Sequence, residues 1–325
     1  MVPLKRRHRL IAWLSFLLVM VLGVLFGQLP GDTLLWGELQ NTAHIPLFGL
    51  VAIATLCVLR ELVPLLRDRP LVGYLLAGVA SFTIGLLTEI AQLLTHRDAS
   101  ISDAMRDLAG TVVGLGLYAS FDPRMQLFWR RQRRGLRAVT IVLSCVVFAV
   151  SLFPLVRLAA AYLQRSAAFP VIVDFRTSWS RAFLQCKSAV LAKVAAAESQ
   201  VSVPDYLTTR LDLDPVPYSG VYVTEPYPDW HSFAYLTFDV YSPQRQPLWL
   251  VLRIHDALHN QAYSDRFNRR LEIRPGNNRF RIPLPAVEAA PAKREMDMSR
   301  IRGLGLFSTD LTRPTSFYLG TLRLE

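Results

Sequence analysis

Five long apolar runs in the first half of the chain constrain its fold more than any other feature. They are Leu10–Phe26, Ile45–Leu59, Leu71–Leu94, Ala104–Phe121 and Val139–Leu158. Runs of this kind are long enough to cross the roughly 30 Å of hydrocarbon in a bilayer, although the second would need its polar flanks to complete the span. The first run lacks a small-residue cleavage site and further spans follow it, so we interpret it as a retained helix. We therefore expect an α-helical bundle of about five transmembrane helices.

Lysine and arginine are distributed unevenly between the loops. Thirteen cations lie before the first run, after the second and after the fourth: Lys5, Arg6, Arg7, Arg9, Arg60, Arg67, Arg69, Arg124, Arg130, Arg131, Arg133, Arg134 and Arg137. The two intervening loops carry only Arg97. Because cytoplasmic loops are enriched in these residues, we expect a multi-pass protein of a bacterial inner membrane with a cytoplasmic N-terminus. Five spans then place the C-terminal domain in the periplasm or outside the cell.

Composition narrows the classes of partner. The chain is 52% hydrophobic with a formal net charge of +11, and the apolar excess lies before about residue 165. The arginines lie between apolar runs instead of along a motif that reads a nucleic-acid groove, so membrane lipid is the expected partner and nucleic acid is not. Cys57, Cys145 and Cys186 provide no disulfide framework. We expect no cofactor, and the sequence indicates no particular protein partner.

Polar residues of the membrane half gather at one level, the outer leaflet. They are His44, Glu89, Gln92, Arg97, Asp103 and Asp107. Glu89 and Gln92 are three residues apart and share a helical face. Asp103 and Asp107 are four apart at the start of the next run, so they also share a face. Ionisable groups at this depth are costly, so they usually pair or line a cavity. A ligand pocket and a structural network both explain them, and Gly110 and Gly114 are typical of a helix-packing seam.

The order of these residues also carries a family resemblance. The stretch consists of Thr88-Glu89-Ile90-Ala91-Gln92, Arg97, Ser100, Ser102-Asp103, Asp107 and Gly110, with His44 before it. It resembles the VanZ-like membrane family over roughly residues 10–120. Two departures concern Gln40-Asn41, where the family has an Asp-Lys pair, and Asp107, where it has Asn. The resemblance implies a role in the cell envelope with lipid-linked or cell-wall substrates.

The second half has the alternating texture of an all-β jelly-roll sandwich. Candidate strands are Leu207–Leu213, Gly220–Thr224, Phe233–Tyr241, Leu248–His255, Arg266–Ile273, Asn278–Leu284, Ile301–Phe307 and Ser316–Leu324. Residues 183–199 are rich in alanine and fit either a helix or interrupted strands. We divide the chain into a VanZ-like four-helix membrane domain (1–121), a basic cytoplasmic loop with the fifth helix (122–165) and an exported β-sandwich (166–325).

Four segments of the second half resemble galactose-binding-like jelly rolls, a group that includes many carbohydrate-binding modules. They are Phe233–Ser242, Leu250–Asp256, Arg274–Asn278 and Phe317–Leu324, within a resemblance that covers roughly residues 171–325. It implies recognition of a glycan or a lipid-linked glycan.

A polar, aromatic stretch supplies the candidate glycan site. Its residues are Trp230, Asp256, His259, Tyr263, Asp265, Arg266 and Asn268, with Tyr222 and Tyr227 as further aromatic candidates. Sugars bind to aromatic faces and to planar side chains that make paired hydrogen bonds with hydroxyls. The alternative is that Asp265 and Arg266 fix the loop while the aromatic rings fill the core. His255 and His259 are four apart, but the first ends a strand, so the helical zinc motif is not expected and we predict no metal.

Three functions remain open at this point. The one favoured is an envelope protein that recognises a glycan and has a polar pocket at the outer leaflet. The second is a membrane-embedded enzyme in which Glu89 and His44, with Asp103 as a further candidate, perform acid–base catalysis while Arg97 holds an anionic group. The third is a transporter coupled through Glu89 and Asp103, against which the sequence shows no inverted repeat.

Overall fold

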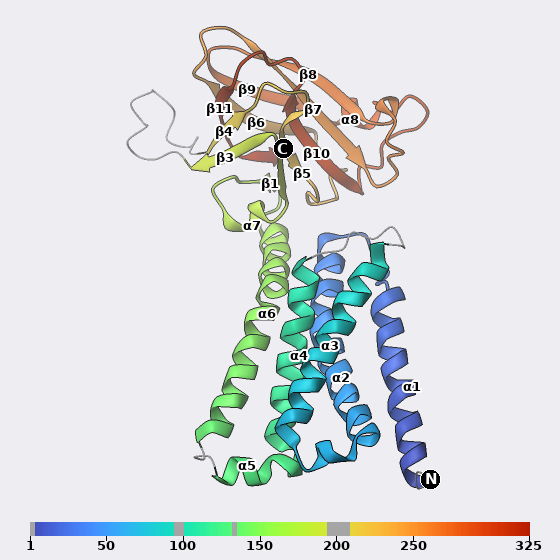
Figure 1. Ribbon diagram of the computed structural model, residues 1–325. Coiled ribbons are helices and arrows are strands. Elements are labelled where there is room, and N and C mark those ends of the chain that lie inside the picture. The colour runs from blue at the N-terminus through green and yellow to red at the C-terminus, as the bar shows by residue number, and fades with distance from the viewer. Residues whose placement is uncertain (1–3, 94–100, 132–134, 194–208) are drawn as a thin grey trace. The chain divides into compact units, whose positions relative to one another are not determined.

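The structure is a computed structural model that describes residues 4–93, 101–131, 135–193 and 209–325. The chain forms two compact units, Met1–Arg157 and Leu158–Glu325. The first unit is helical and the second consists mainly of β-strands (Figure 1). Each unit is described separately below.

The described residues contain eight α-helices instead of the expected number of about five. Five are long: α1 (Leu4–Phe26), α2 (Leu34–Leu62), α3 (Pro70–Leu93), α4 (Ile101–Phe121) and α6 (Gly135–Ala168). Three are short: α5 (Gln126–Arg131), α7 (Ser178–Arg181) and α8 (Leu284–Glu288). The short helices have four to six residues, and the apolar-run criterion does not detect segments of that length. The 3₁₀ turns Pro64–Arg67 and Pro123–Met125 adjoin α2 and α4.

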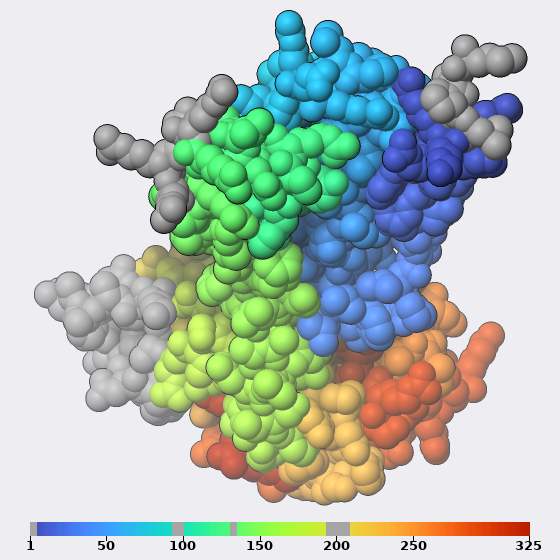
Figure 2. Space-filling model, turned by 90° about the horizontal axis from the view of Figure 1, so that it is seen from below, coloured from blue at the N-terminus to red at the C-terminus, as the bar shows by residue number. Residues whose placement is uncertain are grey.

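Four of the described helices are long and apolar enough to cross a membrane, namely α1, α2, α3 and α6. The expected fourth span, α4, is not among them, because Arg106 and Asp107 reduce its apolar character. In α1 and α6 only 6% of the most apolar stretch is buried, compared with 61% in α2. The dark-blue α1 accordingly lies at an edge of the helical unit in both views (Figures 1 and 2). Large apolar faces of α1 and α6 therefore remain uncovered within the helical unit.

Glycines allow α2 and α4 to approach each other closely. A Cβ added to Gly110 would lie 2.3 Å from the carbonyl oxygen of Ile45, and one added to Gly114 would lie 2.5 Å from the Cα of Gly49. Side chains at these positions would force the helices apart. The packing seam predicted for Gly110 and Gly114 is confirmed, and it fixes α4 against the middle of α2.

The second unit is an antiparallel β-sandwich, as predicted. One sheet has the order β1-β12-β6-β11-β4-β3, with β9 also paired to β6, and the other has the order β2-β5-β10-β7-β8. The strands of the first are β1 (Val171–Val173), β3 (Ala189–Lys193), β4 (Thr209–Leu213), β6 (Tyr235–Ser242), β9 (Gly276–Pro283), β11 (Thr315–Leu319) and β12 (Leu322–Leu324). Those of the second are β2 (Leu184–Lys187), β5 (Ser219–Val223), β7 (Leu248–Asp256), β8 (Phe267–Ile273) and β10 (Ile301–Ser308).

The start of the sandwich corrects two expectations. The described part of the alanine-rich stretch forms β2 and β3, so its strand alternative is correct there; residues 194–199 and the predicted strand start at 207 lie outside the described residues. Helix α6 continues to Ala168, beyond the expected end at Leu158.

Alternation along β7 separates the core from the outer face of the five-stranded sheet. Leu250, Leu252 and Ile254 are fully buried, whereas Arg253 and His255 are half-buried on the opposite face. Because successive side chains of a strand point to opposite faces, the leucines and the isoleucine fill the space between the sheets. The outer face of this sheet presents the polar residues of β7.

Candidate functional site

The α2–α4 seam brings together two predicted site residues of the helical unit. Nδ1 of His44, on α2, lies 2.8 Å from Oδ1 of Asp107, on α4. His44 is 6% exposed and Asp107 is 0% exposed. The other carboxylate oxygen of Asp107 lies against Gly85 of α3, where an added Cβ would be 3.0 Å away. Three helices therefore enclose one carboxylate that is hydrogen-bonded to an imidazole.

Glu89 of α3 completes a buried group that we call the triad, His44, Glu89 and Asp107. Each residue offers one nitrogen or oxygen within 4.8 Å of those of the others, a spacing at which they could hold a metal ion. Two carboxylates and one imidazole are also a set that can exchange protons. Three of the six polar residues expected at one membrane level therefore lie close together.

Gln92 and Asp103 have hydrogen-bond or ion-pair partners outside the triad. Gln92 is buried, and its amide donates to the carbonyl of Val24 on α1 at 3.4 Å. Asp103 pairs with Arg106 of its own helix at 2.5 Å, and the same guanidinium lies 3.6 Å from Glu38. Arg97 lies outside the described residues. The ligand site predicted from all six residues therefore stays a prediction.

A cavity reaches the imidazole of the triad between α1 and α2. Its volume is about 170 Å³ and its lining is Gly23, Val24, Gly27, Gln28, Leu29, Gln40, Ala43, His44 and Leu47. This space is large enough for several water molecules. A proton or a small polar group could reach His44 through it.

Sequence reasoning missed a second buried ion pair in the helical unit. Arg60 donates to Asp122 at 2.6 Å, and Tyr74 donates to the same carboxylate at 2.9 Å. Arg60 is 4% exposed, although the sequence suggested only a loop cation that sets topology. Its position in the last turn of an apolar helix was the available signal.

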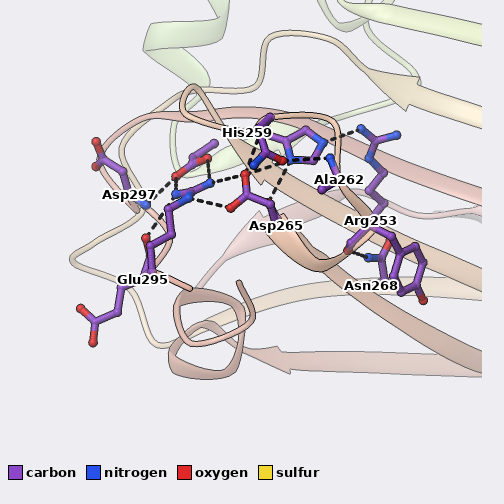
Figure 3. A network of polar contacts seen from close by, with 11 residues as sticks. Arg253, His259, Ala262, Asp265, Asn268, Glu295 and Asp297 are labelled. Atoms are coloured by element: carbon purple, nitrogen blue, oxygen red, sulfur yellow. Dashed lines mark hydrogen bonds and ion pairs between the residues drawn. The ribbon is translucent and has the colours of Figure 1, made fainter. Parts of the chain in front are cut away.

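In the β unit, Arg294 holds two of the predicted site residues, Asp256 and Asp265; the second is labelled in Figure 3. Its guanidinium donates to Asp256 at 2.8 Å and to Asp265 at 2.7 Å. Burial alone would raise the pKa of Asp256, but the hydrogen bonds from Arg294 keep this pKa below its ordinary value. The same partner lowers the pKa of Asp265 to about 2. Both aspartates therefore fix the loop after β7. The sequence offered a structural role for Asp265 paired with Arg266, but in the structure its partner is Arg294.

His259 links this loop to the outer face of the sheet. Its side chain is 1% exposed, and Nδ1 donates to the carbonyl of Asp265 at 2.9 Å. Nε2 then accepts from Nη2 of Arg253 at 3.4 Å (Figure 3). These two contacts specify a neutral imidazole that carries its proton on Nδ1. Arg253 is thus oriented by an uncharged partner.

Register aligns residues of the five strands in one row across the outer face. Gln185 pairs with Tyr222, and Gly305 pairs with both Tyr222 and Arg253. Arg253 pairs in turn with Asn268. Paired residues of neighbouring strands point to the same face of a sheet. Tyrosine, arginine and asparagine side chains therefore lie side by side on that face.

Glycines of the central strand allow two rings to lie down on the sheet. A Cβ at Gly303 would be 2.4 Å from Cε1 of His255, and one at Gly305 would be 2.7 Å from Cδ1 of Tyr222. Side chains at these positions would displace both rings. The centre of the face is therefore a shallow floor edged by aromatic and imidazole rings.

Four buried polar atoms of this face have no hydrogen-bond partner among the described residues. They are Nε of Arg253, Nδ1 of His255, Nε of Arg266 and Oδ1 of Asn268. Burial and the charge of Arg253 lower the pKa of His255 to about 4, so this imidazole is neutral at pH 7. Buried polar atoms normally have partners, so an unpartnered group points to water or to a ligand. We call Tyr222, Arg253, His255, Tyr263, Arg266 and Asn268 the arginine face.

The predicted aromatic residues divide between the core and the surface. Trp230 is 0% exposed and donates to the carbonyl of Tyr227, whose ring packs on Phe169. Trp230 therefore offers no open ring to a ligand. Tyr263 is 71% exposed, and the guanidinium of Arg266 lies 5.2 Å from its ring centre. Trp249, 40% exposed on β7, was not predicted; its alternation with the buried residues of that strand was the signal.

Comparisons with solved structures return carbohydrate-binding modules and agarases. A family 11 carbohydrate-binding module from Clostridium thermocellum, in complex with a mixed-linked β-1,3-1,4 tetrasaccharide, has a TM-score of 0.36 and 13% identity; 47% of this chain and 93% of the module are covered. An exo-β-agarase has a TM-score of 0.37 and 16% identity over 48% of this chain and 24% of its own. A family 30 module of a Clostridium thermocellum cellulase has a TM-score of 0.30 and 14% identity, over 44% and 86%.

Neither a protein-family model nor a curated protein matches the chain. The resemblance to the VanZ-like family accordingly stays a prediction.

Proposed function

We propose that this chain is a multi-pass membrane protein that binds a glycan or a lipid-linked glycan on the arginine face of its β unit. The four apolar helices support the membrane location. We take α4, which packs along α2 through Gly110 and Gly114, as a fifth span; with five spans, the bias of thirteen loop cations against one supports an exported β unit. The observation that carries the binding proposal is the group of four unpartnered polar atoms beside the flat rings of the arginine face.

The chemistry of the face suits a sugar. Tyr222 and Tyr263 offer rings against which the C–H faces of a sugar can pack. The oxygen of Asn268 can accept a hydrogen bond from a hydroxyl group, and the two guanidiniums can donate to ring or hydroxyl oxygens. Partial burial strengthens these hydrogen bonds by excluding water.

A glycan array probed with the full chain in nanodiscs tests this function. We expect binding to at least one oligosaccharide, and Asn268→Ala should weaken it about tenfold because a buried hydrogen bond is lost. Asn277→Ala is the matched control, because Asn277 is exposed on β9 of the other sheet. Equal affinities for the two variants would contradict the proposed site.

Membrane orientation requires its own test. A phosphatase fused after Glu325 should be active, whereas a reporter that fluoresces only in the cytoplasm should be dark. The opposite pattern would contradict an exported β unit.

The triad supports a second candidate function, a membrane-embedded enzyme. The hydrogen bond from His44 to Asp107, the nearby Glu89 and the cavity at the imidazole form a set suited to acid–base catalysis on a lipid-linked or cell-wall substrate. If the triad is catalytic, the Glu89→Gln variant should insert into the membrane normally. It should nevertheless fail to restore the envelope phenotype when it is expressed in a deletion strain. Glu61→Gln removes a carboxylate of the same kind at the C-terminal end of α2, the end opposite His44, and should complement. Equal complementation by both variants would contradict catalysis.

A further inference from the structure

The arginine face contains two guanidiniums that lack a carboxylate partner within the described part of the chain. Arg253 contacts the neutral His259, and Arg266 lies over the ring of Tyr263. Other arginines of the β unit differ: Arg270 pairs with Asp310, Arg274 with Glu272, and Arg294 with two aspartates. Within the described residues, no carboxylate therefore balances the positive charge of Arg253 and Arg266.

The two cations are close enough to disfavour each other. Burial, and next the charge of Arg266, lower the pKa of Arg253. Strand register places the two arginines near each other, since Arg266 directly precedes β8 and Arg253 of β7 pairs with Asn268, two residues after Arg266. Both charges also act on His255 and on Tyr222. Like charges that are partly removed from water repel, and an anion between them would relieve that repulsion.

Hydrogen-bond directions indicate where an anion would bind. Nε of Arg253 and Nε of Arg266 are buried donors without partners. A guanidinium presents its Nε–H and one Nη–H side by side, in the geometry that matches the two oxygens of a carboxylate. An anionic group that displaces the side chains covering these two atoms would therefore meet a donor of each arginine.

The neighbouring atoms suit the uncharged part of a sugar. Oδ1 of Asn268 is an acceptor without a partner, and Nδ1 of His255 is likewise unpartnered. Tyr263 and Tyr222 add rings on either side. A bare phosphate or sulfate would use the arginines but neither the acceptor nor the rings, whereas an acidic sugar would use all three kinds of group.

We infer that the arginine face binds an acidic saccharide, with the carboxylate of a uronate between Arg253 and Arg266 and a sugar hydroxyl donating to Asn268. The inference rests on the proposed glycan-binding function and specifies its ligand class. It requires charge recognition in addition to recognition of the sugar ring.

Calorimetry with matched ligands tests the inference on the unaltered full chain in uncharged detergent. The ligands are galacturonate and glucuronate oligomers and their methyl esters, which retain the rings and hydroxyls but remove the charge. We expect the acid form to bind at least about tenfold more tightly, because hydrogen bonds to a charged group are the stronger ones. Raising the salt concentration should reduce that ratio.

Variants assign the effect to the two arginines. Arg253→Gln combined with Arg266→Gln should bring the ratio of acid to ester affinity to about one, and the affinity for the ester should change less than about threefold. Arg269→Gln is the matched control, because Arg269 is exposed on β8 next to Asn268 and lies on the opposite side of the strand by alternation. This control should leave the ratio unchanged.

The outcomes separate the inference from the function on which it rests. Equal binding of acid and ester, or binding of neutral glycans alone, would overturn the inference and leave the proposed function intact. Binding of no saccharide at all would overturn both. Binding to phosphatidylglycerol vesicles through the same two arginines, without saccharide binding, would identify a lipid surface as the ligand and also overturn the inference.

Discussion

The triad of the helical unit and the arginine face of the β unit have opposite compositions. The triad gathers two carboxylates around one imidazole, and the arginine face gathers two guanidiniums without a carboxylate among the described residues. The triad is enclosed, since none of its residues is more than 6% exposed, whereas Tyr263 on the arginine face is 71% exposed. A large ligand can therefore contact the ring of Tyr263 directly, whereas the triad is approached through the cavity at His44.

Arg294 shows what a purely structural arginine looks like in the same domain. Its hydrogen bonds to Asp256 and Asp265 raise the pKa of its guanidinium and fix the loop after β7. Arg253 lies nearby, but its described hydrogen-bond partner is the neutral His259. The difference in partners separates an arginine that maintains the fold from one that is available to a ligand.

The largest expected effect sharpens that difference. Arg294→Gln should lower the free energy of unfolding of the β unit by about 3 kcal/mol, because it leaves the fully buried carboxylate of Asp256 unpaired. Arg253→Gln should cost less than about 1 kcal/mol, since only one hydrogen bond to a neutral group is lost. Hydrogen exchange of β7 peptides in the full chain would measure both values. Similar losses for the two variants would contradict the distinction.

An intermediate effect concerns the seam that assembles the triad. Gly114→Ala should lower the stability of the helical unit by about 1–3 kcal/mol, because its Cβ would lie 2.5 Å from the Cα of Gly49. Gly37→Ala on α2 is the matched control, and it should stabilise the helix by about 0.5–1 kcal/mol because an added Cβ meets no atom within 4 Å. Thermal unfolding in detergent would report both changes. A harmless Gly114→Ala would show that the seam does not position His44 and Asp107.

The smallest expected effect is a dependence on acid pH in the β unit. Asp265 has a folded pKa of about 2, below the ordinary 3.8, and that of Asp256 is also lowered. Their contribution to stability is therefore complete above the ordinary value and is lost as pH falls from about 4 towards 2. Near-ultraviolet circular dichroism during thermal unfolding should show this decline. In Arg294→Gln this decline should be weaker or absent, because the hydrogen bonds that hold both folded pKa values below the unfolded ones are lost. An unchanged curve would argue against Arg294 as the cause.

Periodicity in the sequence predicted most of the architecture. The apolar runs indicated the long helices, and the alternation in the second half indicated the sandwich, because both signals depend on local burial. Helices α5, α7 and α8 escaped prediction because they are too short to form an apolar run. The apolar runs predicted α4 as one of five spans, although Arg106 and Asp107 make it less apolar than the other four. Asp107 lies in the interior of the bundle, where it is hydrogen-bonded to His44.

Site prediction was less complete because it depends on contacts between distant segments. His44, Glu89 and Asp107 were identified from their common membrane level, and the structure brings them together. Arg253 was missed because the local sequence does not show which arginines have carboxylate partners. Arg294, 41 positions later, pairs with two aspartates, whereas Arg253 pairs with none among the described residues. Trp230 was one candidate for an aromatic platform, and the structure places it in the core, in line with the alternative that the aromatic rings fill the core. An aromatic residue beside a polar loop does not reveal its burial from sequence.

Hydrogen exchange with and without a bound uronate oligomer tests the central claim most directly. The account predicts that the ligand protects residues 248–273 of the full chain, which include Arg253, Arg266 and Asn268, and leaves the exchange of α2, α3 and α4 unchanged. Protection confined to the helices around His44, or to the other sheet, would contradict a glycan site on the arginine face.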